Sequence, residues 1–84
     1  MTLAEIETRL LAILGRCSGL VEEERLRCDR FLVMAREPGV ALENLCVQLV
    51  DGESPVPRDL FDELVTVAKA MGLNESYWSL VRHG

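Results

Sequence analysis

The sequence has few of the residue types that carry chemistry in enzymes and metal proteins. Its 84 residues include a single histidine, His83, three cysteines and only 5% aromatic residues. An odd number of cysteines argues against a closed disulfide framework, and the spacing of Cys17, Cys28 and Cys46 matches no metal-ligand signature. His83 is the penultimate residue, where we expect a frayed end that cannot hold a general base. The sequence therefore predicts no enzymatic activity, no metal and no cofactor.

The chain also lacks a targeting or membrane-spanning pattern. Acidic residues follow Met1 closely, so the basic start of a signal peptide is missing, and no apolar run approaches the length that crosses a bilayer. We expect a cytoplasmic protein with no membrane contact. In that reducing compartment the cysteines are expected to be free thiols, with Cys28 and Cys46 buried on the apolar faces of helices.

Positive charge is scarce. Lys and Arg number 9 against 14 Asp and Glu, which leaves a formal net charge of -5 at pH 7. An acidic surface repels the phosphate backbone, so direct nucleic-acid binding is disfavoured, and it attracts basic protein surfaces. The apolar share of 49% is enough for one compact core, whereas two cores would leave each half too small. We expect a single helical domain over residues 1–84.

Apolar residues recur at helical spacing, and no stretch alternates as a strand does. Thr2 with Glu5 fits a capping box, Pro38 suits the first turn of a helix, and Gly72 suits a helix end. The predicted fold is all-α, a compact bundle of about five short helices. Their expected ranges are 3–15, 20–36, 39–51, 58–71 and 75–82.

The apolar pattern also predicts which sides of the helices face the core. In the second helix this inner face comprises Val21, Cys28, Phe31, Leu32 and Ala35. Asp29 and Arg25, four residues apart, are expected to pair on its exposed side. The third helix is apolar on most sides, which indicates the most enclosed position, with Gly52 in the left-handed conformation after it. Trp78 and Val81 of the last helix are expected to face inward.

Acidic residues surround the third helix. Glu37 precedes it, Glu43 lies within it, and Asp51 and Glu53 lie at its end. Four carboxylates around one helix predict a negative patch that speeds the encounter with a basic partner; a solvated helix face is the other interpretation. Tyr77 is expected to point at least half outward, as interface aromatics do. These five residues are the candidate partner-binding site.

Three segments of the sequence resemble a known family. They are residues 37–45 (EPGVALENL) with Leu49, residues 68–73 (AKAMGL), and Tyr77 with Trp78. Their order and spacing are similar to those of the small MafI-type immunity proteins of bacteria, over about residues 26–82. The resemblance implies an all-α protein encoded beside a secreted or contact-delivered toxin, which binds the C-terminal domain of that toxin, often a nuclease. The segment 53–58, with Pro55 and Pro57, departs from the polar helix cap expected there.

The charge and the resemblance together suggest a function. We expect an immunity protein that neutralises a cognate bacterial toxin domain with a basic surface, by occluding its active site or its substrate-binding surface. The resemblance carries no catalytic residues and does not identify the contact residues. The alternative is a non-catalytic helical adaptor or a homodimeric assembly module that uses leftover apolar surface on the first helix. A small enzyme or metal protein is a third interpretation.

Overall fold

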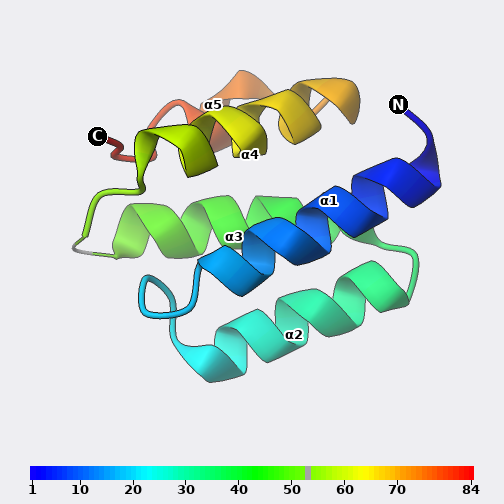
Figure 1. The fold of residues 1–84 in the computed structure, drawn as a ribbon, viewed down its shortest axis with the longest axis horizontal. Coiled ribbons are helices and arrows are strands. Elements are labelled where there is room, and N and C mark those ends of the chain that lie inside the picture. Colours follow the sequence, from blue (N-terminus) through cyan, green and yellow to red (C-terminus); the bar gives the residue numbers. More distant parts are fainter. Residues whose placement is uncertain (53) are drawn as a thin grey trace.

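The computed structural model describes residues 1–52 and 54–84. These residues form five α-helices and no β-strand, which confirms the predicted all-α bundle (Figure 1). The helices are α1 (Leu3–Arg16), α2 (Glu23–Met34), α3 (Pro38–Asp51), α4 (Arg58–Ala70) and α5 (Glu75–Trp78). None of the described helices is both long and apolar enough to cross a membrane.

Local signals in the sequence set where three of the helices begin. The Thr2 hydroxyl accepts a hydrogen bond from the Glu5 amide at 3.2 Å and caps α1. Pro38 is the first residue of α3, where its missing N–H costs no hydrogen bond. The Asn74 side chain accepts a hydrogen bond from the Ser76 amide at 2.8 Å and caps α5. These three starts agree with the sequence prediction to within about one residue.

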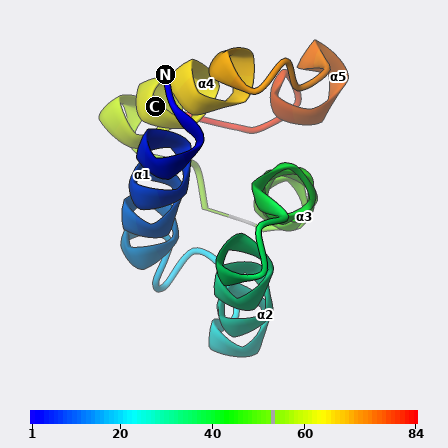
Figure 2. The ribbon, with the colours of Figure 1, turned by 90° about the vertical axis from the view of Figure 1, so that its right-hand side faces the viewer.

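α3 packs against α1, α2 and α5 on its inner side. Figure 2 shows it end-on, with α1 to one side, α2 below and α5 above. Its buried residues are Pro38, Ala41, Leu42, Leu45, Cys46 and Leu49. α1 packs against α2, α3 and α4, so one mostly aliphatic core joins the four long helices. The predicted enclosure of the third helix is correct on this inner side, but Val40 and Val47 face solvent.

α2 buries a different side from the one that the apolar pattern predicts. Cys28, Phe31 and Ala35 were expected to face inward and are exposed. The buried residues of the helix are Leu26, Asp29 and Val33. One position along a helix turns a side chain by about 100°, so the true face differs by about one residue. The neighbours of α2 decide this face, because α1 and α3 both pack against it. The helix also begins later than predicted, at Glu23, because residues 17–21 form a turn.

A tight corner joins α2 to α3. The Glu37 amide donates a hydrogen bond to the Leu32 carbonyl oxygen at 2.9 Å, and the Arg36 amide donates to the Val33 carbonyl oxygen at 3.1 Å. This pair of hydrogen bonds is the Schellman motif, which needs a left-handed residue. Arg36 takes that conformation, with a φ of 64°. Pro38 then starts α3 at once, so the two helices form a hairpin.

The C-terminal segment differs from the long last helix that was expected. α5 ends at Trp78 rather than near residue 82. The following residues return to the segment before α4, where the Val56 amide donates to the Arg82 carbonyl oxygen at 2.9 Å. The His83 ring stacks on Phe61 with 3.8 Å between the ring centroids. These contacts hold His83 in place, so the expectation of a frayed end is wrong.

Trp78 covers one side of the core without being enclosed in it. Its side chain is half-buried and packs against the core cluster. The Lys69 ammonium lies 5.7 Å from the centroid of its ring, a favourable position for a cation over an aromatic face. Val81 is buried, as predicted.

Candidate protein-binding surface

One side of α3 carries no neighbouring helix. In Figure 2, α1, α2 and α5 lie around α3 and leave its outer side uncovered. The exposed residues on this side are Val40, Asn44, Val47 and Asp51. Their spacing of three and four residues places them in one stripe along the helix, which we call the open face of α3. Val47, at its middle, is 53% exposed. The open face therefore combines apolar surface with a carboxylate.

The predicted acidic residues are spread along α3 and do not gather in one patch. Glu37 is exposed at the N-cap, Glu43 is half-buried one turn from Val47, and Asp51 is exposed at the last position. α3 has 14 residues, so Glu37 and Asp51 lie about 20 Å apart. Glu53 lies outside the described residues. Glu43 and Asp51 are therefore the predicted acids that border or belong to the open face.

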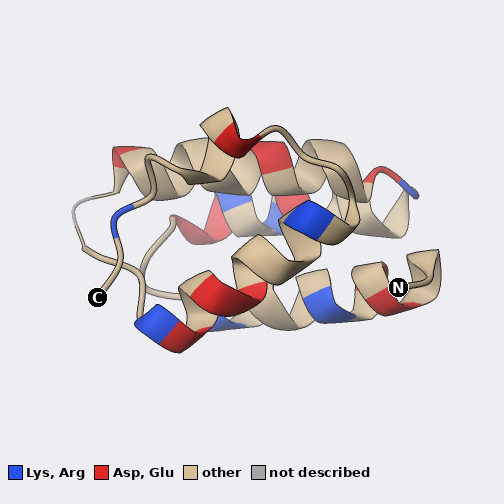
Figure 3. Ribbon diagram, turned by 90° about the horizontal axis from the view of Figure 1, so that it is seen from above, with Lys and Arg blue, Asp and Glu red and all other residues tan. Residues whose placement is uncertain are grey.

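The acids of α3 differ from many others in having no ion-pair partner. In the described part of the chain, arginines pair with Glu7, Glu23, Asp59, Asp62 and Glu63. No pair among the same residues involves Glu37, Glu43 or Asp51. Figure 3 shows acidic and basic positions interspersed over the ribbon, but residues 37–57 contain no Lys or Arg. Acids without an ion-pair partner leave a negative potential that attracts a basic surface, which Arg25 and Arg82 reduce at the Asp51 end of the helix.

A small polar pocket lies at the end of the open face. It occupies about 300 Å³ between the start of α2 and the end of α3. The polar residues that line it are Glu22, Arg25, Gln48 and Asp51. Gly52 borders it with a φ of -69°, so the predicted left-handed conformation is wrong. A Cβ at this position would lie 3.3 Å from the Leu20 carbonyl oxygen, and this close approach explains why glycine fits there.

Asp29 of α2 is fully buried against α3, which the sequence did not predict. Gln48 Nε2 donates a hydrogen bond to Asp29 Oδ1 at 3.3 Å. In the described chain, Asp29 Oδ2 and Gln48 Oε1 are buried without a hydrogen-bond partner. Burial raises the pKa of the Asp29 carboxyl, and the hydrogen bond from Gln48 and the charges of Arg25 and Arg30 oppose the rise. The expected exposed pair of Asp29 with Arg25 is therefore wrong.

Tyr77 exposes only part of its side chain. It is half-buried on α5 and packs against the core, and α5 itself packs against α3. Apolar side chains with a larger exposed fraction lie elsewhere, at Phe31 and Met34 of α2 and at Leu80 after α5. Of these three, Phe31 was predicted to face the core because it lies at helical spacing with other apolar residues, and no prediction was made for Met34 or Leu80.

The three thiols differ in burial. Cys17 and Cys46 are buried, as predicted for Cys46, and burial raises their pKa values to about 11 and about 12. Both are therefore protonated and unreactive at neutral pH. Cys28 is exposed, so the prediction that it is buried is wrong. Over the residues that the structure describes, no group of three or more His, Cys, Asp or Glu is placed to hold a metal ion.

The comparisons with known proteins do not place the chain in a family. No family model matches it, and no curated protein sequence and no solved structure is significantly similar to it. The likeness to the MafI-type immunity proteins therefore stays a prediction from the residues of the sequence.

Proposed function

We propose that this protein neutralises a bacterial toxin domain by binding it and covering its active site or substrate-binding surface, without catalysis of its own. The observation that carries the proposal is the open face of α3. There Asp51 and the neighbouring Glu43 have no ion-pair partner among the described residues, and Val40 and Val47 are exposed. Unpaired acids beside apolar surface suit a partner of opposite charge. The choice of a toxin domain rests on the sequence resemblance.

Inhibition follows from exclusion of the substrate. A toxin domain that acts on nucleic acid has a basic cleft, because the cleft must bind phosphates. The acids of α3 would attract that cleft over a Debye length of about 10 Å at 0.1 M salt. On contact, Val40 and Val47 lose their water, and Glu43 and Asp51 pair with Lys or Arg of the toxin. The polar pocket beyond Asp51 has room for one long side chain of the partner.

Co-expression tests the proposal in cells. The protein is produced together with the toxin domain encoded beside its gene, and cell survival is scored with and without it. We expect survival only when the protein is present, and a stable complex of the two purified proteins. A toxin that stays fully active in the presence of the folded protein contradicts the proposal.

Charge reversal tests whether the acids of α3 guide the association. Asp51→Lys combined with Glu43→Lys should lower the association rate at low salt by about tenfold, because electrostatic steering raises such rates by one to three orders of magnitude. The matched control is Glu24→Lys combined with Glu75→Lys, which changes the net charge equally at exposed positions of α2 and α5 that form no ion pair among the described residues. Stopped-flow measurement at two salt concentrations gives the rates. Equal slowing by both variants would show that net charge, and not the open face, governs association.

A further inference from the structure

Two buried oxygen atoms between α2 and α3 need a hydrogen-bond donor. They are Asp29 Oδ2 and Gln48 Oε1, and neither has a partner among the described residues. Their side chains are already joined, because Gln48 Nε2 donates to Asp29 Oδ1 at 3.3 Å. An ionised carboxylate and an amide oxygen can only accept hydrogen bonds, so these two oxygens cannot bond to each other while Asp29 is charged.

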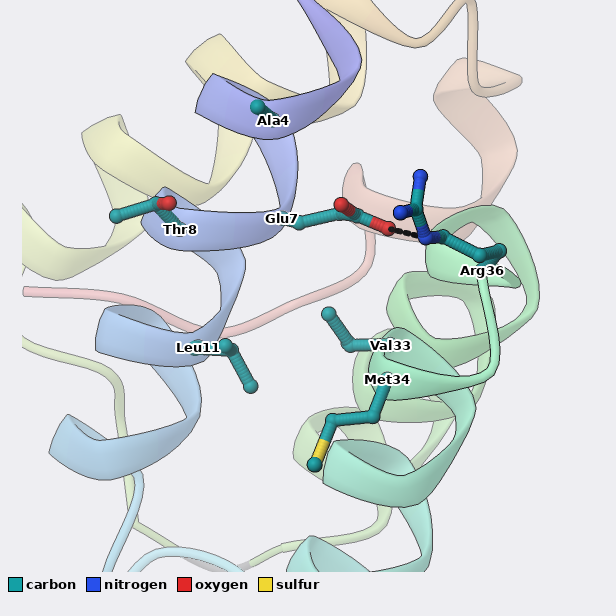
Figure 4. A pocket seen from close by; sticks show the side chains of 7 residues that line it. All are labelled: Ala4, Glu7, Thr8, Leu11, Val33, Met34 and Arg36. Atoms are coloured by element: carbon teal, nitrogen blue, oxygen red, sulfur yellow. Dashed lines mark ion pairs between the residues drawn. The ribbon is translucent and has the colours of Figure 1, made fainter.

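The other buried carboxylate oxygen without a hydrogen bond has a cation beside it. Glu7 Oε2 lies 3.8 Å from Arg36 Nε, which balances its charge (Figure 4). Asp29 is fully buried and takes part in no ion pair within the described part of the chain. A buried carboxylate without an ion-pair partner is costly, and the uptake of one proton removes its charge.

We propose that Asp29 takes up a proton on Oδ2 as the pH falls and donates it to Gln48 Oε1, so that the acid and the amide form a closed pair with two hydrogen bonds between α2 and α3. The proton comes from the solvent and forms an O–H bond at Oδ2. A carboxylic acid and a primary amide each offer one donor and one acceptor, which suits this pairing. One proton thus supplies the donor that both oxygens lack.

The groups around Asp29 allow it to become neutral. On α2, the charges of Arg25 and Arg30 favour the ionised form, but Arg25 is exposed and Arg30 is paired with another carboxylate. At the end of α1, Cys17 has a pKa raised to about 11, so its thiol is neutral as well. On α3, Gln48 carries no charge. Burial is the largest influence, and it raises the pKa of Asp29.

The closed pair links protonation to the surface beside the open face. Gln48 lines the polar pocket at the end of that face. While Asp29 is ionised, one hydrogen bond holds the amide of Gln48; in the closed pair, both its nitrogen and its oxygen are engaged. A fall in pH through the raised pKa of Asp29 therefore tightens the contact of α2 with α3 and fixes one wall of the pocket. This stabilisation is lost again as the pH rises through that value.

Nuclear magnetic resonance of the Gln48 side chain tests the proposal. Gln48 is the only glutamine of the chain, so ¹⁵N-labelled glutamine gives one pair of side-chain amide resonances. These resonances should shift with the same midpoint as the Asp29 carboxyl carbon, and the shift should be absent in Asp29→Asn. Asp51→Asn is the matched control, since Asp51 lines the same pocket, and it should leave the shift intact. A shift that survives Asp29→Asn, or that Asp51→Asn abolishes, overturns the proposal.

Exchange of the acid and the amide between the two positions tests the closed pair itself. Asp29→Asn with Gln48→Glu keeps both side-chain lengths, so its equilibrium constant of unfolding at pH 5 should stay within about threefold of that of the unmodified protein. Gln48→Glu alone places two acids together and should raise that constant at pH 7 by about tenfold or more. Urea unfolding followed by circular dichroism measures both. A double variant that unfolds as readily as Gln48→Glu alone at both pH values overturns the closed pair. Both experiments use the protein alone, so their outcome is independent of toxin binding.

Discussion

The acidic residues at the seam between α1 and α4 form ion pairs, whereas those on the open face of α3 form none in the part of the chain that the structure describes. At the seam, Arg9 Nε lies 2.6 Å from Glu63 Oε1, and Arg16 Nη2 lies 2.8 Å from Asp59 Oδ2. On α3, Asp51 has no such partner among the described residues. The acids at the seam help to hold two helices together, whereas those on α3 remain available to a second molecule. The amino-acid composition alone does not distinguish the ion-paired acids from the unpaired ones.

The pKa values of the carboxyl groups distinguish the ion-paired acids at the seam from the buried Asp29. The hydrogen bond from Arg16 lowers the pKa of Asp59, and the hydrogen bond from Arg9 lowers that of Glu63. Their contribution to stability is present at neutral pH and is lost as pH falls through these lowered values. Asp29, buried between α2 and α3, has a raised pKa, so its effect on stability has the opposite sign.

The largest effect is expected from the two sides of α3. Leu45 is fully buried, so Leu45→Ala should lower the free energy of unfolding by about 2–5 kcal/mol. Val47 lies on the open face, and Val47→Ala should change that free energy by less than about 0.5 kcal/mol. Urea unfolding followed by circular dichroism measures both. A similar loss for the two variants would mean that a contact missing from this fold covers the open face.

A smaller effect is expected at Asp29. Asn has nearly the same shape as Asp, so Asp29→Asn removes a buried charge without opening a cavity. It also replaces Oδ2, which has no described hydrogen-bond partner, with an NH₂ donor. At pH 7 it should therefore raise the free energy of unfolding by about 1 kcal/mol. The raised pKa gives the sign of the pH dependence: the native state of the unmodified protein takes up a proton before the unfolded state does. The gain from Asp29→Asn should therefore shrink as pH falls through that raised pKa.

Unfolding curves at several pH values measure this difference directly. Glu24→Gln, at an exposed position of α2 with no ion pair among the described residues, is the matched control and should leave the free energy of unfolding almost unchanged. A gain from Asp29→Asn that grows as pH falls would show that the buried carboxylate stabilises the native protein.

The smallest effect is expected at the seam. Glu63→Gln removes the charge that pairs with Arg9, and both side chains are partly exposed to solvent. The loss of unfolding free energy should be smaller than the gain at Asp29, and it should disappear at 1 M salt because ions screen exposed pairs. Thermal unfolding at low and high salt measures it. A loss that is equal at both salt concentrations would mean that packing, and not charge, acts at this position.

The parts of the fold that depend on local chemistry could be predicted from the sequence. Thr2, Pro38 and Asn74 mark the starts of α1, α3 and α5 because their preferences act within one turn of the chain. The buried side of α2 could not be predicted, because it depends on how α1 and α3 pack against this helix in the folded chain. The apolar pattern consequently placed Phe31 inside, and Asp29 outside.

The candidate site also has features that could be predicted from the sequence and features that depend on how the helices pack. The acids Glu43 and Asp51 could be assigned to the third helix from periodicity alone. That they have no counter-ion depends on which arginines reach which helices, and this is a property of the packed chain. The exposure of Met34 and the half-burial of Tyr77 likewise depend on how the helices meet.

The left-handed Arg36 has a consequence for the orientation of the open face of α3. A non-glycine residue in this conformation costs about 1 kcal/mol, yet it fixes the angle between the two arms of the α2–α3 hairpin. One arm is α2, which packs against α1, and the other is α3, which carries the open face proposed to bind the toxin. The orientation of that face relative to the rest of the bundle therefore depends on the backbone conformation of one residue.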